Sequence, residues 1–304
     1  MTVMNYEYWT FIQEYARIEY AVISCIVLLL LLYSFVLFVR NLQISSKVPI
    51  SVQKVLIITA HPDDECMFFS PTIQSLLNSG HFVHLLCLSN GNFYGLGKTR
   101  SLELFNSCEA LGIPLRNVYL FNHSDLQDHP EHPWKLKNVE KIILPVMYYL
   151  QPHLVITFDN YGVSGHSNHI SIHDALQSLS NKGILPNNLR AFHLKSSSIF
   201  RKYVSILDLP LTILTSQYLS VVSPWGLLKG WWAMLNHWSQ FVWFRALYIV
   251  FSRYMLINTL EEILPQDISM SSTDDEEEQN LPNKLKVADR RSKMRRGKGS
   301  SRVE

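Results

Sequence analysis

The chain has 304 residues and a mass of 35.2 kDa, which is enough for one large domain or two small ones with a hydrophobic core. Hydrophobic residues make up 47% and charged residues 17%, and the mean hydropathy of +0.05 is high for a soluble protein, so a membrane segment is expected. The net charge of +2 indicates no class of partner by itself, and four cysteines without a CxxC pair argue against a disulfide framework or a thiolate zinc site.

The first element predicted along the chain is a single membrane-spanning helix at 20–39, after a short N-terminal segment at 1–19. The uncharged run YAVISCIVLLLLLYSFVLFV is long enough, as a helix, to cross the roughly 30 Å hydrocarbon core of a bilayer. A cleaved signal peptide is the alternative, but Glu7, Glu14 and Glu19 stand where a basic region is needed, and no small-residue cleavage site follows. Basic residues are more frequent after the span, so the positive-inside rule predicts that the rest of the chain faces the cytoplasm.

A linker at 40–53 leads into a predicted domain at 54–265, in which strands and helices alternate. The predicted strands are 54–59, 82–88, 117–121, 153–158 and 191–194, and the predicted helices are 67–79, 98–111, 136–150 and 169–179. Short apolar strands separated by helices predict an α/β fold, with a Rossmann-like parallel sheet and helices on both faces. The polar-rich loops follow the strands, and ligands of such sheets bind at the carboxyl ends of the strands. We therefore expect the functional site at that edge.

Two segments stand outside this alternating pattern. Residues 224–260 contain five of the seven tryptophans with interspersed Lys and Arg, which is typical of an interfacial membrane helix, although a helix buried in the domain is an equal alternative. Residues 266–304 run from the acidic cluster TDDEEE into a basic stretch, which predicts a disordered charged tail. The basic half could touch anionic lipid headgroups, although a solvated tail is favoured.

The strongest chemical signals are HPDDE after the first strand and GHSNH after the fourth. His61 and Asp64 can supply two zinc ligands, and either His166 or His169 can supply a third, which leaves a position for water. His173 lies four residues past His169 and offers a competing pair on the same helical face. The acids could instead only cap the following helix, but capping does not explain the second histidine-rich loop. A dication would offset the repulsion among the three adjacent acids and leave one of them free for proton transfer.

These motifs resemble the LmbE-like family of zinc-dependent de-N-acetylases. AHPDDE and GHSNH match the family as a whole, whereas KTRSLEL, VITFDNYGVSGHSNH, RKYVSILDLPL and FRALYIVFSRYMLIN resemble its eukaryotic branch, and together they cover residues 55–258. The resemblance implies a zinc-dependent amidohydrolase that removes the acetyl group from N-acetylglucosaminyl-phosphatidylinositol, an early step in the biosynthesis of glycosylphosphatidylinositol (GPI) anchors. Mn, Fe or Co could occupy the same ligand set in place of zinc.

The resemblance also implies a role for each residue of the two motifs. Zinc would be held by His61, Asp64 and His169, Asp63 would be the general base, and His166 would stabilise or protonate the tetrahedral intermediate.

Two further residues match substrate-binding positions of the family. Arg100 corresponds to the arginine that holds the substrate, and Asp125 corresponds to an acid of the pocket.

The resemblance further implies an endoplasmic reticulum membrane location, a phosphatidylinositol glycolipid as substrate, other GPI-pathway enzymes as partners, and no nucleic-acid partner. A non-catalytic membrane scaffold of a glycolipid-modifying complex is one alternative, but it predicts a damaged metal set, and the motif residues are all present. A deacetylase of a soluble N-acetyl conjugate is another, which the membrane anchor disfavours. Nucleotide binding at GNFYGLG is weakly supported because these glycines follow the second strand and do not fit the GxGxxG register.

Overall fold

The computed structural model describes residues 2–43, 54–130, 132–216 and 218–266. Most of the predicted linker, from 44 to 53, and the predicted tail from 267 onward lie outside the described residues.

The N-terminal part of the chain forms one long helix, α1 (Thr2–Gln43). The helix includes the whole of the predicted span at 20–39 and continues through the segment before it. Its stretch Gln13–Phe35 has a mean hydropathy of 2.2 and is long and apolar enough to cross a membrane.

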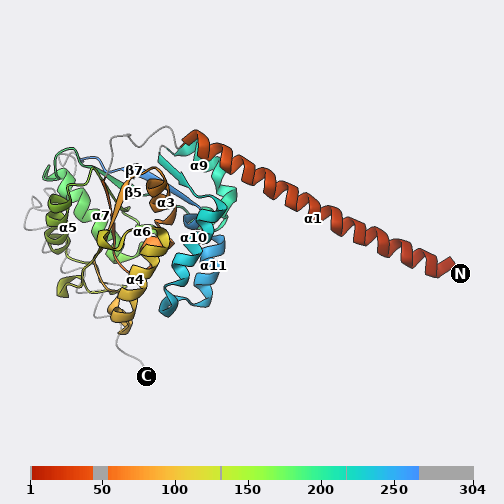
Figure 1. The fold of residues 1–304 in the computed structure, drawn as a ribbon, viewed down its shortest axis with the longest axis horizontal. Coiled ribbons are helices and arrows are strands. Elements are labelled where there is room, and N and C mark those ends of the chain that lie inside the picture. The colour runs from red at the N-terminus through yellow and green to blue at the C-terminus, as the bar shows by residue number, and fades with distance from the viewer. Residues whose placement is uncertain (1, 44–53, 131, 217, 267–304) are drawn as a thin grey trace, which may run out of the picture. The chain divides into compact units, whose positions relative to one another are not determined.

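Seven strands of the described residues form one sheet in the order β3-β2-β1-β4-β5-β7-β6. Figure 1 shows this sheet, with β5 and β7 labelled, among the helices of the domain. The five parallel strands are β1 (Lys54–Thr59), β2 (Phe82–Cys87), β3 (Val118–Leu120), β4 (Leu154–Phe158) and β5 (Arg190–Leu194). They confirm the predicted Rossmann-like fold class. Two antiparallel strands, β7 (Ile257–Glu262) and β6 (Tyr218–Val221), extend the sheet beyond β5, and the alternating sequence pattern did not predict them.

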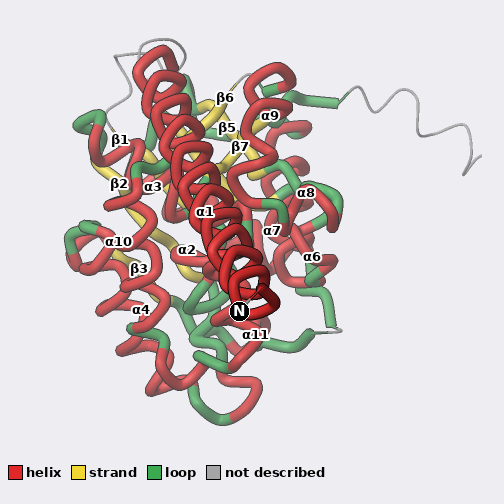
Figure 2. Tube along the Cα trace, turned by 90° about the vertical axis from the view of Figure 1, so that its right-hand side faces the viewer, coloured by secondary structure: helices red, strands yellow, loops and turns green. Residues whose placement is uncertain are grey.

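Helices cover both faces of the sheet. The longer ones are α3 (Ser70–Asn78), α4 (Gly97–Leu111), α5 (Leu136–Leu150), α7 (Ser167–Asn181), α10 (Pro224–Leu235) and α11 (Trp243–Phe251). Short helices are α2 (Asp64–Met67), α6 (Gly162–Gly165), α8 (Ile199–Tyr203) and α9 (Leu209–Thr215), with 3-10 turns η1 (Asn92–Tyr94), η2 (Leu115–Asn117), η3 (Ser124–Leu126), η4 (Ser205–Asp208), η5 (Trp238–Gln240) and η6 (Arg253–Met255). Figure 2 shows the strands as an inner layer with helices around them.

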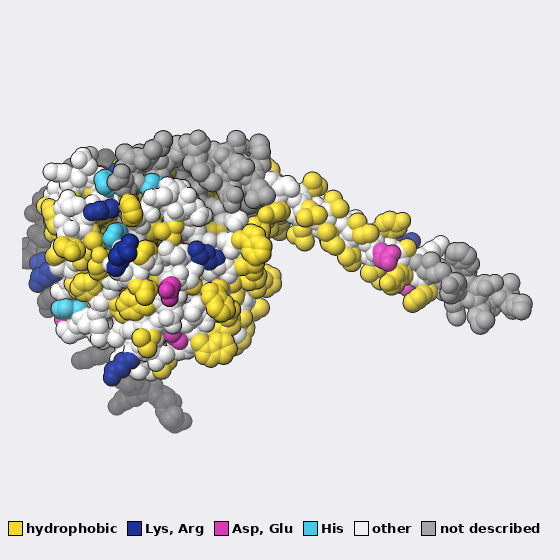
Figure 3. Space-filling view, in the orientation of Figure 1, with side chains coloured by type: hydrophobic (Ala, Val, Ile, Leu, Met, Phe, Trp, Pro, Cys, Tyr) yellow, Lys and Arg dark blue, Asp and Glu magenta, His cyan; other side chains and the backbone are white. Residues whose placement is uncertain are grey.

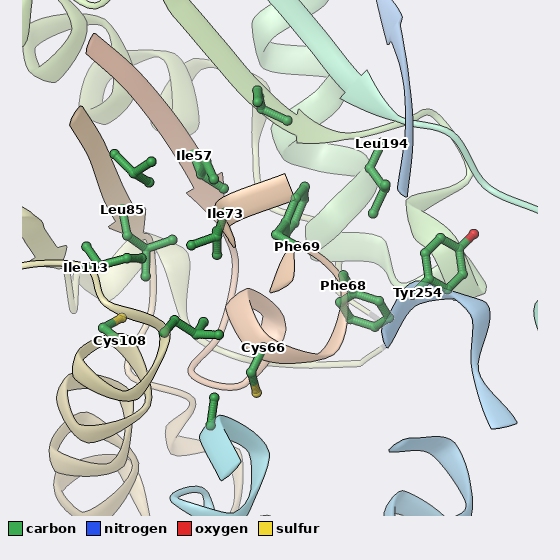
Figure 4. Packing of buried hydrophobic residues seen from close by; sticks show 14 of the residues in the cluster. Ile57, Cys66, Phe68, Phe69, Ile73, Leu85, Cys108, Ile113, Leu194 and Tyr254 are labelled. Atoms are coloured by element: carbon green, nitrogen blue, oxygen red, sulfur yellow. The ribbon is translucent and has the colours of Figure 1, made fainter. Parts of the chain in front are cut away.

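The alternation of side chains along β1 explains why this strand is apolar from Val55 to Ile58. Val55 and Ile57 pack with α3, α4, α10 and α11 on one face, whereas Leu56 and Ile58 pack with α5 and α7 on the other. All four are fully buried, as expected for a central parallel strand covered on both sides. In Figure 4, Ile57 shares the first of these cores with Leu85 and Ile73.

The predicted helix 67–79 is divided into α2 and α3. Pro71 lies in the first turn of α3, where its missing N–H group costs no hydrogen bond, so a new helix begins there. The break leaves α2 as a single turn directly after the HPDDE sequence.

Candidate metal-dependent active site

The HPDDE loop follows β1 at the point where the strand order reverses, because β1 lies between β2 and β4. The Asp64 carboxylate is buried there, and its Oδ2 accepts hydrogen bonds from the backbone N–H groups of Ala60 and His61, each at 2.9 Å. The loop therefore holds this carboxylate in one orientation at the carboxyl end of the sheet.

The second histidine-rich loop follows the neighbouring strand β4 and leads into α7. Gly162 has a φ of +61°, and a Cβ atom at this position would lie 2.9 Å from the Cβ of His169, so glycine permits the close approach. His169 Nδ1 lies 3.1 Å from the Gly162 carbonyl oxygen, and its ring stacks on Phe158 with ring centroids 3.8 Å apart. These contacts fix the position of the His169 imidazole.

The two loops bring three imidazoles together. One ring nitrogen each from His61, His166 and His169 lies within 4.8 Å of the others. Asp64 Oδ1 lies 3.3 Å from His169 Nε2, and Asp64 Oδ2 lies 3.8 Å from His61 Nδ1. His173 belongs to another cluster, since its Nδ1 contacts Asp174 at 3.1 Å and its ring neighbours His193.

The chemistry of these donors fits a divalent metal. His169 Nδ1 faces a carbonyl oxygen and so carries the proton, which leaves a lone pair on Nε2. This Nε2 is buried and makes no hydrogen bond, a costly state for a polar atom unless a ligand occupies it. Two imidazoles and a carboxylate, as in His61, Asp64 and His169, are a ligand set that catalytic zinc uses.

The side chains of this group, His61, Asp64, His166 and His169, lie close enough to shift one another's pKa values. Although burial opposes ionisation of Asp64, the neighbouring His169 and His61 hold the pKa of its carboxyl far below the usual range. Burial opposes the charged form of His61 too, but the hydrogen bond to Asp128 and the nearby carboxylates raise its pKa above 6.5. Burial, together with the other two histidines, lowers the pKa of His166 to about 4, so this imidazole is neutral at neutral pH.

The proposed base, Asp63, has a strained backbone and two guanidinium neighbours. Its φ of +118° is unusual for a residue with a side chain, and its N–H group donates to Glu65 Oε2 at 3.0 Å. Asp63 Oδ2 lies 2.5 Å from Arg245 Nη1 and 3.8 Å from Arg100 Nη2. The backbone hydrogen bond and the two guanidinium groups therefore hold this carboxylate in one position.

Glu65 connects the loop to a part of the chain that sequence reasoning missed. Its Oε1 lies 2.7 Å from His237 Nε2 and accepts a hydrogen bond from Ser107, and both partners of the pair are fully buried. Although burial opposes ionisation, His237 and Ser107 lower the pKa of Glu65. Cys66 lies beside the pair, and burial raises the pKa of its thiol well above the usual value.

The two predicted substrate-binding residues differ in their placement. Arg100 is buried and donates to the carbonyl oxygens of Pro62 and Gly91, each at 2.8 Å, so it borders the HPDDE loop. Asp125 is half exposed, and the ion pair of its carboxylate is with His123 at 3.9 Å. The acid of this loop that reaches the group is Asp128, which lies 3.1 Å from His61 Nε2 and 3.3 Å from Arg100 Nη1.

Comparison with known proteins places this chain among deacetylases. The sequence profile of the family described as GlcNAc-PI de-N-acetylase matches residues 56–180. The N-acetylglucosaminyl-phosphatidylinositol de-N-acetylase of Bos taurus is 42% identical over 208 residues, which cover 68% of this chain and 82% of the relative. The probable enzyme of the same name from Dictyostelium discoideum is 39% identical over 245 residues, covering 69% and 93%.

A solved structure supports the fold independently. The N,N'-diacetylchitobiose deacetylase from Pyrococcus horikoshii superposes with a TM-score of 0.51 over 70% of this chain and 84% of that protein, at 20% sequence identity. At that identity the likeness shows the shared fold alone.

Proposed function

The chain belongs to the N-acetylglucosaminyl-phosphatidylinositol de-N-acetylase family, and from this we propose that it hydrolyses the acetamide of N-acetylglucosaminyl-phosphatidylinositol to glucosaminyl-phosphatidylinositol and acetate. The observation that carries the proposal is the convergence of the HPDDE and GHSNH loops on one buried group at the carboxyl edge of the sheet. The reaction would be an early step of GPI-anchor biosynthesis.

His61, Asp64 and His169 would hold the metal, with zinc as the first candidate and Mn, Fe or Co as alternatives. When bound, such an ion polarises an amide carbonyl and lowers the pKa of a bound water towards about 7. The buried His169 Nε2, which makes no hydrogen bond and lies 3.3 Å from Asp64 Oδ1, supports this assignment. Asp128 and Asn168, each 3.1 Å from His61 Nε2, border the same group.

Asp63 would act as the general base that takes the proton of the attacking water and later returns it to the leaving amine. Positioned proton transfer of this kind contributes on the order of a hundred- to ten-thousand-fold in rate. The Asp63 carboxylate contacts Arg245, and the Asp63 backbone N–H donates to Glu65 Oε2. Both contacts hold the residue in place, so little reorganisation is needed during the reaction.

His166 would stabilise the negative oxygen of the tetrahedral intermediate. Its Nδ1 accepts a hydrogen bond from the Asn168 backbone N–H at 3.3 Å, which places the proton of the neutral ring on Nε2. Because the pKa of His166 is lowered to about 4, this side chain would donate as a neutral imidazole. A single well-placed oxyanion donor is worth roughly 3–4 kcal/mol in the transition state.

The membrane part of the proposal rests on α1 and on the lipid character of the substrate. We propose a single-pass protein of the endoplasmic reticulum membrane whose domain, residues 54–265, faces the cytoplasm. The apolar stretch Gln13–Phe35 supports the anchor. Arg100 would hold the substrate, and other enzymes of the GPI pathway would supply and consume the glycolipid.

Acetate release from the acetylated glycolipid by the detergent-solubilised full chain tests this function. We expect activity in the native protein and a loss of at least about a hundredfold in Asp63→Asn, with unchanged metal content. Asp174→Asn is the matched control, because this acid is exposed on α7 and pairs with His173 and not with the proposed metal ligands. A native rate in Asp63→Asn would remove the proposed base. A preference for the same headgroup without its lipid chains would favour the soluble-conjugate alternative.

A further inference from the structure

The last third of the domain presents a large exposed apolar surface, which we call the aromatic face. Its members are exposed side chains of α8, η4, α9, α10, η5 and α11, namely Ile199, Phe200, Leu207, Leu211, Leu214, Trp225, Trp232, Trp238, Trp243, Phe244, Leu247, Val250 and Phe251. Trp225 is 80% exposed and Trp243 is 76% exposed. Contiguous apolar surface of this extent on a folded domain marks a binding site for a membrane or a protein.

Helix α11 shows how the aromatic face relates to the active site. Its outward positions Trp243, Phe244, Leu247, Val250 and Phe251 follow the spacing of one helical face, and each is about half or more exposed. On its inward side, Tyr248 and Ile249 enter the core, and Arg245 reaches Asp63. The same two and a half turns therefore carry an apolar surface on one side and a contact to the proposed base on the other.

The members form one continuous surface. The indole N–H of Trp231 in α10 donates to the Ile249 carbonyl of α11 at 2.7 Å, which joins these two helices side by side. Helix α8 contacts both α11 and η4, and η4 leads directly into α9. In Figure 3, hydrophobic side chains gather on the right-hand side of the domain, over α10 and α11.

The charges in this region indicate what covers the aromatic face. Residues 199–251 contain a single acid, Asp208, which is buried and paired with Arg201 at 2.6 Å and Arg253 at 3.1 Å. The basic residues include Lys229, which is exposed, and Lys202, which is partly exposed. A surface of tryptophan and aliphatic side chains with basic groups and no exposed carboxylate is complementary to an anionic lipid leaflet.

We propose that the aromatic face docks onto the phosphatidylinositol-containing leaflet, so that the catalytic domain lies on the membrane independently of α1. The proposal rests on the proposed function in that the lipid substrate resides in this leaflet. Through α11, docking would hold the Arg245–Asp63 end of the site close to the headgroups. A second copy of the chain, or a protein partner, would instead leave the domain free of lipid once α1 is detached.

The test separates the domain from α1 after assembly. The full chain, with a protease site inserted between residues 44 and 53, is reconstituted into phosphatidylcholine–phosphatidylinositol vesicles and cut, and the vesicles are floated. We expect the cut domain to float with the vesicles, also at high salt, because apolar burial and not only charge retains it. Release as a monomer would overturn the proposal, and release as a dimer would overturn it and identify a second copy as the occupant.

Two variants assign retention to the aromatic face. Trp243→Glu combined with Leu247→Glu should lower the floated fraction at least about tenfold, whereas Tyr149→Glu, on the exposed surface of α5, should leave it unchanged. Equal retention of all three proteins would overturn the assignment. The floated fraction is measured without any enzymatic reaction. The docking proposal is therefore tested even if the protein does not deacetylate the glycolipid.

A measurement without substitutions at the face covers the case in which the double variant does not fold. In full chain carrying only Trp9→Phe, tryptophan fluorescence is compared between vesicles of ordinary and of brominated-chain lipids. Quenching supports the proposal, since Trp225, Trp232, Trp238 and Trp243 are exposed and Trp134 is buried. Unchanged fluorescence would overturn it.

Discussion

Arg245 Nη1 lies 2.5 Å from Asp63 Oδ2, so a helix near the end of the domain contacts the loop that follows its first strand. Arg245 lies beyond the segment 56–180 that matches the family profile. The segment that contributes Arg245 also contributes His237, which binds Glu65 two residues further along the HPDDE loop. The tryptophan-rich part of the chain therefore also contributes the two side chains that contact acids of the HPDDE loop.

We expect Arg245→Ala to lower kcat by on the order of ten- to a hundredfold, because the Asp63 carboxylate loses the contact that orients it. Arg245→Lys should recover part of the loss, since the charge remains but the planar guanidinium does not. Steady-state kinetics on the glycolipid measure both, with Lys141→Ala as an exposed basic control in α5. A change confined to KM would show that Arg245 binds substrate and does not position the base.

The loop after β3 offers two acids, and we expect only one of them to matter strongly. Asp128→Asn should reduce metal affinity or activity on the order of tenfold or more, because Asp128 contacts both His61 and Arg100. Asp125→Asn should stay within about twofold, since Asp125 is half exposed and paired with His123. The reverse order of effects would favour the pocket role that the family resemblance implies for Asp125.

The part of the site that the sequence predicted comes from loops directly after parallel strands. Such loops meet at one edge whatever the detailed packing, so HPDDE and GHSNH could be placed together from the strand order alone. His169 and His173 were both open as ligands, and the contacts of His173 with Asp174 and His193 separate it from the group.

The other residues around the site, Arg245, His237 and Asp128, are brought there by tertiary packing, which leaves no pattern in the local sequence. Arg245 lies in the apolar helix α11, and His237 lies in the turn between α10 and η5. The spacing of residues in these segments does not reveal which polar group turns inward. Asp128 and Asp125 are three residues apart around a 3-10 turn, where no periodicity selects one of them. Strands β6 and β7 are antiparallel, and they pair with distant segments that local sequence does not specify.

Removing only one partner of the buried Glu65–His237 pair should destabilise the protein strongly. Either Glu65→Leu or His237→Leu leaves a buried polar partner unpaired and should cost about 3–5 kcal/mol in the free energy of unfolding. The double variant should lose clearly less than the sum of the two. Denaturant unfolding of the detergent-solubilised chain measures this cycle, and additive losses would mean that the two side chains are not coupled.

His193 predicts an acid-sensitive stability. Burial, together with the neighbouring His173, lowers the pKa of His193 below 6.5. The unfolded chain therefore binds a proton below pH 6.5 that the folded chain binds only at lower pH, so stability is lost as the pH falls through this window. One such proton changes the free energy of unfolding by at most about 1.4 kcal/mol per pH unit. His193→Gln should flatten the profile between pH 6.5 and the folded pKa, and an unchanged slope would contradict the assignment.

Metal removal and two histidine substitutions in α7 test whether His169 or His173 binds the metal. A strong chelator should abolish deacetylation and lower the unfolding temperature, because a ligand present at about a hundred times its dissociation constant adds about 2.7 kcal/mol to the folded state. His169→Ala should lose both the bound metal and the stabilisation that zinc confers, since its Nε2 makes no hydrogen bond and faces Asp64 Oδ1. His173→Ala should keep both, because its imidazole pairs with Asp174 away from the group. Elemental analysis with thermal unfolding decides between them, and metal loss in His173→Ala alone would transfer the site to the other pair.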